Sequence, residues 1–516
     1  MEENKMSKGK EILAILLLTL VIGTGTLAWI VWSSKDNTKM NVTIGDLADV
    51  SFKSGNDINI SNLSPSFYYD DGALTEFSIR KKKGLTTELN TNIYLDITSI
   101  SDELKNDNFK YVLLSSSDGN TYNEVISSSF KDASIGKLSI VTDSPLTDGK
   151  TYYKFYIWID GNNENNETMQ GKSLKGTLNV DVSTPPVNAV TLVEGLDKGE
   201  TGDSGSGVYK VTHSARPASS SATGSEIPAV TDYRYYGPSP NNYICLDMEG
   251  GSTCPDKHLY RIIGSIYEEK ENTNRIKVIK ATPLTDGTTK GFSWDYKVNN
   301  GSVSYDNIWA TITSGNYSNS LTSGASLMQL LNSGAWWNGT SGSYYNNSTT
   351  ATTVNFTNYK LSDKAKSYIT TSRYYLGGYK NQTPLTNEMY GYERGIKRYN
   401  TDRPLYWEGM VGLMYPSDYG YAAGNTCVTG TKLWDYSGGC MNKDWLHISN
   451  TDQWLMLPYS GNSVLVFRTS SSGFVHNYGD GSISYNVRSA RPVFFLSSSA
   501  SISEGEGTSA APYILS

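Results

Sequence analysis

The sequence predicts a multidomain protein, in which an N-terminal membrane helix is followed by an all-β sandwich and then by an α+β module. Three observations support this fold class: a long apolar segment near the N-terminus, a stretch where apolar and polar residues alternate, and a C-terminal part that mixes strand and helix patterns. A chain of 516 residues is also too long for one hydrophobic core, so several domains are expected.

The N-terminal segment Ile12–Trp32 contains no charged residue and follows Lys5, Lys8 and Lys10. As an α-helix it would be about 31 Å long, which matches the hydrocarbon core of a bilayer. The basic flank would stay inside the cell. The small residues that end at Ala28 also suit signal-peptide cleavage. The segment therefore predicts the membrane as a partner, with either a single-pass anchor and an extracellular C-terminal part or secretion after cleavage at Ala28.

We assign residues 1–34 to this helix and residues 40–185 to the β-sandwich. Apolar and polar residues alternate in Leu174–Val182, and Ile93–Ile97 and Tyr153–Ile159 repeat this pattern of half-buried strands. Turn residues lie between the runs, and no convincing helix interrupts them, which predicts a sandwich of short strands. The loop that follows Ile159 is rich in Asp, Asn and Glu, but it lacks the spacing of a calcium loop and is interpreted as a polar turn.

Residues 186–234 are predicted to form a linker. Prolines at 185 and 186 end the preceding strand, and Gly199–Gly207 and Ala218–Gly224 are rich in Gly, Ser, Thr and Ala. Such a composition buries too little apolar surface to form a core. We therefore expect a flexible tether.

Residues 235–516 mix strands and helices. Leu259–Tyr267 and Arg275–Lys280 have strand patterns, whereas Ser326–Gly334 and Leu361–Ile369 place apolar residues on one helical face. This order predicts an α+β module.

The overall composition favours an exported protein that does not bind nucleic acid. Charged residues are only 18% of the chain and the net charge is −7, without long runs of one sign, so no nucleic-acid-binding face is expected. There are 37 tyrosines against 12 phenylalanines, which suits exposed sheets with a wet surface.

The four cysteines form two close pairs, Cys245 with Cys254 and Cys427 with Cys440. An even number of cysteines in an exported chain favours local disulfides. Neither pair has the spacing of a zinc or redox motif, and the histidines are scattered, so no metal site is predicted.

Aromatic doublets in polar surroundings are the candidate ligand contacts, because exposed rings stack on sugars or on protein surfaces. The alternative is that half of each doublet belongs to the core and half decorates the surface. The candidates are Trp336, Trp337, Tyr344, Tyr345, Tyr374 and Tyr375.

Four short motifs give the first part of the chain a resemblance to a known family: Gly23–Ala28 after the apolar segment, Asn41–Leu47, Tyr156–Gly161 and Met169–Gly171. Residues 12–183 thereby resemble the camelysin/TasA-like surface and biofilm-fibre proteins of Gram-positive bacteria. The resemblance implies a secreted, jelly-roll-like module of a biofilm matrix, in which an N-terminal strand pairs with a neighbouring subunit.

The C-terminal part ends in the apolar strand Val487–Leu496, which contains an Arg-Pro-Val step, and carries the segment Trp407–Tyr421. These features resemble the C-type-lectin-like fold, in the version shared by formylglycine-generating enzymes and by uncharacterised surface proteins of gut Firmicutes. The resemblance implies an architecture over most of residues 235–516 and no reaction. The sequence signatures of calcium-dependent lectins are absent, which leaves metal-free binding open.

We therefore expect a cell-surface or secreted binding and adhesion protein, whose β-sandwich stalk displays a lectin-like head to glycans, host proteins or sister cells. The alternative is a structural fibre subunit that self-assembles through the β-sandwich. A third hypothesis, an oxidative enzyme on the lectin-like scaffold, needs reactive thiols at Cys427 and Cys440. No catalytic residue and no cofactor is predicted, and we expect no enzyme activity.

Overall fold

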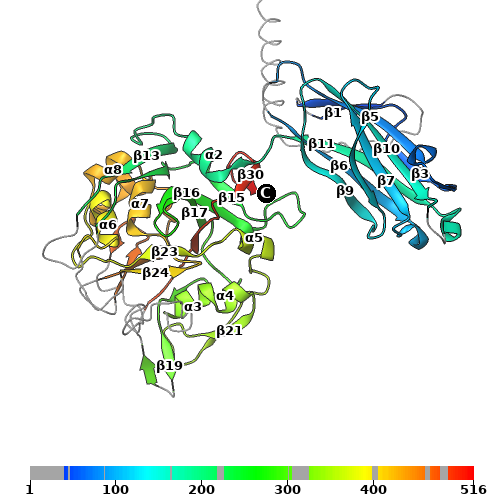
Figure 1. Cartoon of the computed structure of the whole chain (residues 1–516). Coiled ribbons are helices and arrows are strands. Elements are labelled where there is room, and N and C mark those ends of the chain that lie inside the picture. The colour runs from blue at the N-terminus through cyan, green and yellow to red at the C-terminus, as the bar shows by residue number, and fades with distance from the viewer. Residues whose placement is uncertain are drawn as a thin grey trace, which may run out of the picture. The chain divides into compact units, whose positions relative to one another are not determined.

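The structure is a computed structural model that describes residues 40–44, 47–85, 88–162, 166–217, 226–299, 302–304, 325–397, 405–459, 465–476 and 486–516. The chain forms two compact units, Met1–Pro185 and Pro186–Ser516 (Figure 1). The predicted membrane segment Ile12–Trp32 lies outside the described residues. Among the helices within them, none is long and apolar enough to cross a bilayer.

The N-terminal unit is all-β, as predicted, and consists of two sheets. The seven-stranded sheet has the order β1 (Met40–Ile44), β2 (Ala48–Phe52), β5 (Ala73–Lys81), β10 (Lys150–Asp160), β7 (Phe109–Ser116), β8 (Asn123–Ser129), with β4 (Pro65–Ser66) beside β10. The second sheet has the order β3 (Asp57–Ile60), β11 (Leu174–Ser183), β6 (Asn90–Ile100), β9 (Gly136–Pro145). Apart from the parallel β4–β10 pair, neighbouring strands are antiparallel.

Alternating side chains from both sheets build one shared hydrophobic core, which makes the unit a β-sandwich. Strand β11 follows the predicted pattern, because Leu174, Leu178, Val180 and Val182 are buried. Gly176 lies at a register shift in this strand, and a Cβ atom there would lie 2.6 Å from the carbonyl oxygen of Asp96. A side chain at this position would push β11 away from β6.

The C-terminal unit is built around a nine-stranded sheet. Seven strands follow one another in the order β12 (Val187–Asn188), β30 (Ser501–Glu504), β31 (Tyr513–Leu515), β15 (Tyr243–Cys245), β16 (Leu259–Glu268), β14 (Val230–Tyr236), β13 (Gly207–His213). Strand β17 (Thr273–Lys280) pairs with β16, and β29 (Val493–Phe495) pairs with β17.

Small sheets and short helices surround this sheet. Four two-stranded sheets pair β18 (Phe292–Ser293) with β28 (Val487–Arg488), β19 (Lys297–Asn299) with β20 (Ser302–Ser304), β21 (Ser341–Tyr344) with β22 (Thr352–Asn355), and β23 (Ser372–Tyr375) with β24 (Tyr406–Gly409). A three-stranded sheet has the order β25 (Gln453–Pro458), β26 (Val466–Thr469), β27 (Val475–His476). The α-helices of this unit are α2 (Ala189–Gly195), α3 (Ser326–Asn332), α4 (Ala335–Asn338), α5 (Asp363–Ser367), α6 (Thr386–Glu393), α7 (Pro416–Ala422), α8 (Asn425–Gly430) and α9 (Gly438–Met441).

Two of these helices were predicted from the apolar spacing. Helix α3 buries Leu327, Leu330 and Leu331. Helix α5 begins after Ser362, whose hydroxyl accepts a hydrogen bond from the backbone N–H of Ala365 and so satisfies a free donor of the first turn. The α+β prediction for this part of the chain agrees with the mixture of strands and helices.

The predicted linker 186–234 is largely folded into the C-terminal unit. Helix α2 buries Ala189 and Val193 in the main core, and β13 pairs along its whole length with β14. The tether interpretation failed here because strand β13 is stabilised by pairing with the next strand, β14, whereas the local composition is dominated by the Gly/Ser-rich residues before it.

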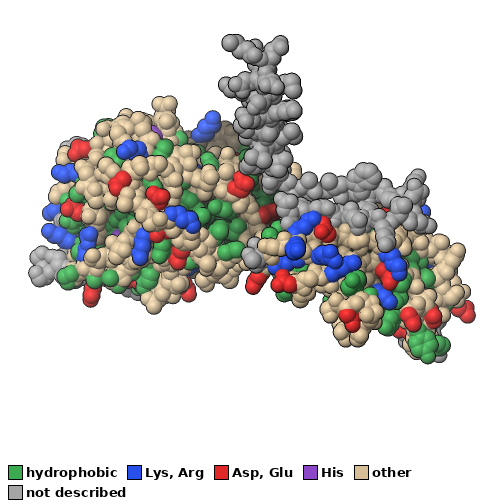
Figure 2. Space-filling model, turned by 90° about the horizontal axis from the view of Figure 1, so that it is seen from above, with side chains coloured by type: hydrophobic (Ala, Val, Ile, Leu, Met, Phe, Trp, Pro, Cys, Tyr) green, Lys and Arg blue, Asp and Glu red, His purple; other side chains and the backbone are tan. Residues whose placement is uncertain are grey.

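Both predicted disulfides are present, Cys245–Cys254 and Cys427–Cys440, and both lie in the C-terminal unit. On the face shown in Figure 2, basic and acidic side chains are scattered among neutral ones.

Candidate ligand-binding pocket

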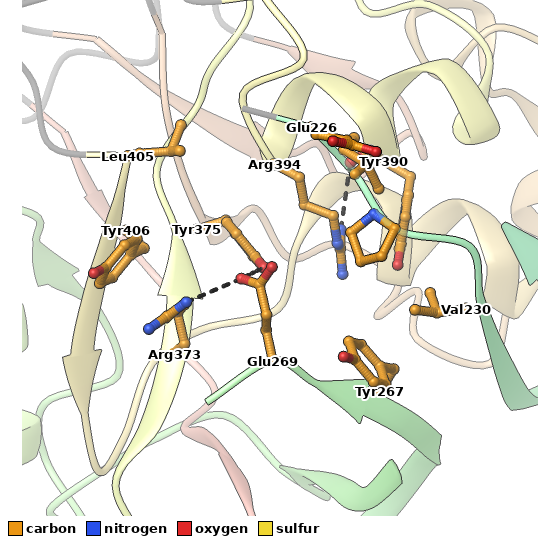
Figure 3. Close-up of a pocket in the computed structure, with 12 residues that line it drawn as sticks. Glu226, Val230, Tyr267, Glu269, Arg373, Tyr375, Tyr390, Arg394, Leu405 and Tyr406 are labelled. Carbon is orange, nitrogen blue, oxygen red and sulfur yellow. Dashed lines mark hydrogen bonds and ion pairs between the residues drawn. The ribbon is translucent and has the colours of Figure 1, made fainter. Parts of the chain in front are cut away.

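The C-terminal unit contains a cavity of about 280 Å³ in which charged side chains and tyrosine rings converge (Figure 3). Its lining comes from the chain around β14, the end of β16, the paired strands β23 and β24, and the helix α6. The lining residues are Glu226, Ile227, Pro228, Val230, Tyr267, Glu269, Arg373, Tyr375, Tyr390, Arg394, Leu405 and Tyr406.

The antiparallel pair of strands β23 and β24 positions one wall of the pocket. Arg373 pairs with Glu408 and Tyr375 pairs with Tyr406 across the two strands. Because side chains alternate along a strand, Tyr374 points the other way and is fully buried in the core. The alternation thus places Arg373 and Tyr375 together on the pocket side.

Arg373 is held by two carboxylates. Its Nη1 lies 3.1 Å from Glu269 Oε2, and its Nη2 lies 3.2 Å from Glu408 Oε1. The hydroxyl of Tyr375 also donates to Glu269 (Figure 3). The guanidinium of Arg373 stacks over the ring of Tyr406 at 4.0 Å from its centroid. This wall is therefore a rigid, charge-paired surface.

Arg394 forms the opposite part of the site and is stacked on Tyr390, with 3.4 Å between the guanidinium carbon and the ring centroid. The imidazole of His213 lies parallel to the same ring at a centroid distance of 3.6 Å. Two groups this close to one centroid must occupy opposite faces of the ring. Tyr390 is therefore sandwiched between His213 and Arg394, which fixes the direction of the guanidinium.

A buried ionic network supports this stack from behind. His213 Nε2 lies 2.9 Å from Asp232, which also pairs with Arg234 at 2.8 Å. Arg234 in turn pairs with Asp418 at 3.0 Å, and Asp418 pairs with Lys277 at 2.5 Å. Burial alone would raise the pKa of Asp418, but these two cations hold it below its usual value.

Glu393 lies directly behind Arg394 and is fully buried. It accepts hydrogen bonds from the backbone N–H of Ser417 at 2.8 Å and from the Ser417 hydroxyl at 2.5 Å. Burial raises the pKa of Glu393 to about 7, and the nearby Asp418 adds to this, although Arg394 and Ser417 oppose the shift. At neutral pH this carboxyl is therefore only partly ionised.

A second polar cluster lies at the Cys245–Cys254 loop, where Asp247, Glu249 and His258 bring ligand atoms within 4.8 Å of one another. These residue types suit a metal ion. However, Lys257 Nζ lies 2.8 Å from Glu249 and already neutralises this carboxylate. An ion-pair cluster that braces the disulfide loop explains the arrangement.

The polar loop after Ile159 has a similar explanation. Asp160 pairs with Lys110 at 2.5 Å and accepts a hydrogen bond from the backbone N–H of Asn162. A lysine therefore occupies the position at Asp160 that a cation would need.

The structure divides the six predicted contact residues between the core and the surface. The first member of each doublet is buried: Trp336, Tyr344 and Tyr374. The second member is partly exposed in each case: Trp337, Tyr345 and Tyr375. Only Tyr375 among the six lines the pocket. This distribution follows the alternative in which half of each doublet belongs to the core.

Sequence reasoning missed the other pocket residues, including Arg373 and Arg394. The available signal was local: an arginine directly before the Tyr374–Tyr375 doublet and a tyrosine-rich, charged segment over α6. Nothing in the sequence indicated that these segments meet near Glu269, more than a hundred residues earlier.

No protein-family model matches the chain, and no curated protein sequence is significantly similar to it. The geometry of the pocket therefore carries the functional argument.

Proposed function

We propose that the protein is a cell-surface or secreted binding protein whose C-terminal unit recognises a carbohydrate in the pocket between Glu269, Arg373 and Arg394. The observation that carries this proposal is the pocket lining, in which two arginines, two glutamates and four tyrosine rings surround one small cavity. Its volume of about 280 Å³ suits a single sugar unit better than a bulky ligand.

Carbohydrates can interact with all three kinds of group in the lining, namely carboxylates, guanidinium groups and tyrosine rings. Their hydroxyls donate to carboxylates such as Glu226 and Glu269 and accept from guanidinium groups. Their C–H faces pack against aromatic rings, which Tyr267, Tyr375 and Tyr406 offer here. Charge pairing within the lining keeps the polar groups in place before a ligand arrives, which reduces the entropy cost of binding.

The display of this unit is part of the proposal. Two disulfides are typical of a protein that works outside the reducing cytoplasm. We propose that Ile12–Trp32 exports the chain, that the β-sandwich acts as a stalk, and that the C-terminal unit is a C-type-lectin-like head. The Cys427–Cys440 bridge leaves neither thiol free for the oxidative chemistry considered above.

A glycan array probed with the full chain, kept in mild detergent, tests this function. We expect binding to a defined group of glycans and its loss in Glu269→Gln and Tyr406→Ala. Tyr152→Ala, a tyrosine substitution in the N-terminal unit, is the matched control and should leave the array pattern unchanged. Binding that is absent, or that is equally strong in both pocket variants, would contradict a carbohydrate site here.

A specific observation also favours self-assembly as a second candidate function. Phe67 and Tyr68 in the N-terminal unit are 68% and 69% exposed, and the neighbouring Tyr69 packs against Tyr156 and Trp158. Exposed aromatic groups of this size commonly mark protein contacts.

The double variant Phe67→Ser/Tyr68→Ser tests this candidate. If the patch joins copies of the chain, sedimentation should show assemblies for the wild type and monomers for the variant. A wild type that stays monomeric at high concentration would contradict self-assembly.

A further inference from the structure

The two arginines of the pocket differ in how far the protein itself satisfies them. Arg373 has a carboxylate at each end of its fork, Glu269 and Glu408, at 3.1 and 3.2 Å, although its buried Nε has no partner among the described residues. The ion pair of Arg394 among the described residues is with Glu393, and its distance of 3.5 Å is long for a hydrogen bond. The charge of Arg394 is thus the less compensated of the two.

The donors of Arg394 are also incompletely used. Its Nη1 donates to the carbonyl oxygen of Tyr390 at 3.3 Å. Its Nε and Nη2 have no hydrogen-bond partner in the part of the chain that the structure describes. The side chain is nevertheless only 11% exposed. These two donors are not enclosed by the protein, so a ligand in the cavity can accept hydrogen bonds from them.

The free donors point into the cavity. In Figure 3 the guanidinium of Arg394 reaches toward the space between Tyr375, Tyr267 and Val230. Stacking on Tyr390, whose position is in turn supported by the parallel ring of His213, stabilises the guanidinium in this orientation. The protein therefore presents a preorganised arginine fork to a bound ligand.

We propose that the pocket selects a sugar acid, a hexuronate or a related carboxylated sugar, whose carboxylate pairs with Arg394. This inference rests on the proposed carbohydrate function and names the class of sugar. The planar guanidinium matches a carboxylate with two parallel hydrogen bonds. The sugar hydroxyls are left to donate to Glu226 and Glu269.

The charges of the lining favour a carboxylate over a phosphate ester. Two arginines and two glutamates line the cavity, and Arg373 is already paired. A ligand with one negative charge can pair with Arg394, whereas a doubly charged phosphate ester would be repelled more strongly by Glu226 and Glu269. The partial protonation of Glu393 also favours a carboxylate ligand, because a partly neutral Glu393 competes only weakly with the ligand for Arg394.

Isothermal titration of the full chain with glucuronate and with glucose tests this inference, since the two sugars differ by a carboxylate in place of a hydroxymethyl group. We expect the wild type to prefer glucuronate by about tenfold or more. Arg394→Gln should abolish the preference and still bind glucose, and Arg394→Lys should retain only part of it because a lysine lacks the planar fork. Arg80→Gln in the N-terminal unit is the matched control.

The outcomes distinguish failure of the sugar-acid inference from failure of the proposed carbohydrate function. Equal affinity for the two sugars in the wild type, or a preference that survives Arg394→Gln, would overturn the sugar-acid inference and leave a carbohydrate site standing. No binding of either sugar, together with an empty glycan array, would overturn both. Circular dichroism of each variant excludes misfolding as the cause of a lost preference.

Discussion

The two units differ in what they bury. Among the described residues of the N-terminal sandwich, Asp160 is the only charged side chain in the interior, and the core is otherwise built from alternating apolar residues. The C-terminal unit buries a chain of ion pairs through Asp232, Arg234, Asp418 and Lys277. Apolar packing stabilises the sandwich, whereas the buried charges of the C-terminal unit support the polar pocket from behind. The comparison suggests that binding belongs to the C-terminal unit.

The largest effect that would sharpen this contrast is expected for Asp418→Ala. Removing this carboxylate leaves Arg234 and Lys277 buried without their partner, which typically costs about 3–5 kcal/mol. Urea unfolding followed by peptide-resolved hydrogen exchange should show this loss in the C-terminal unit only.

The matched substitution in the N-terminal unit is Asp107→Ala, whose partner Lys131 lies on the surface. It should leave the stability of the sandwich unchanged, because exposed ion pairs contribute little. Equal effects of the two substitutions would remove the contrast between the units.

The next largest effect is expected on the pH dependence of stability, through the ionisation of Glu393. Its pKa in the folded protein, about 7, is higher than the ordinary glutamate value of about 4.3 in an unfolded chain. The folded state therefore binds more protons between these values, and the stability of the C-terminal unit should fall as the pH rises from about 4.5 to 7. The loss is on the order of 3 kcal/mol.

The variant Glu393→Gln should remove this pH dependence, because a neutral amide does not ionise. Arg394 and Asp418 are the charged groups that shift the pKa of Glu393, and both keep their charge between pH 4.5 and 7. A wild type and a variant with the same stability profile between pH 4.5 and 7 would contradict the raised pKa.

A loss of stability of similar or smaller size is expected when a disulfide is removed, and both disulfides lie in the C-terminal unit. Replacing Cys427 and Cys440 by serine should cost about 3 kcal/mol, the value for a loop of about 15 residues. The N-terminal unit contains no cysteine and serves as the internal control in the same hydrogen-exchange experiment. A change in the sandwich on loss of this bridge would show that the units do not unfold independently.

Local patterns predicted much of the fold. The alternation in Leu174–Val182 predicted strand β11, and the spacing of Leu327, Leu330 and Leu331 predicted helix α3, because burial on one face leaves a period in the sequence. Strand β13 was missed because it lies in a stretch whose Gly/Ser-rich composition predicts a linker, and its pairing with β14 is not visible in that composition. Cysteine spacing predicted the disulfides for a similarly local reason.

The pocket could be predicted only in small part. Tyr375 was among the candidate contacts, but the aromatic doublets did not reveal which ring of each pair faces the core. Arg394 and Glu269 are far apart in sequence and meet only through the packing of α6 and β23 beside the end of β16. Neither residue carries a motif, so their convergence becomes visible only in three dimensions.

Hydrogen–deuterium exchange of the full chain with and without the best sugar from the array tests most directly whether the C-terminal pocket is the binding site. We predict slower exchange in peptides that cover 226–230, 267–269, 373–375, 390–394 and 405–406, with no change in the N-terminal sandwich. Protection confined to the sandwich, or to parts of the C-terminal unit away from the pocket, would contradict the account.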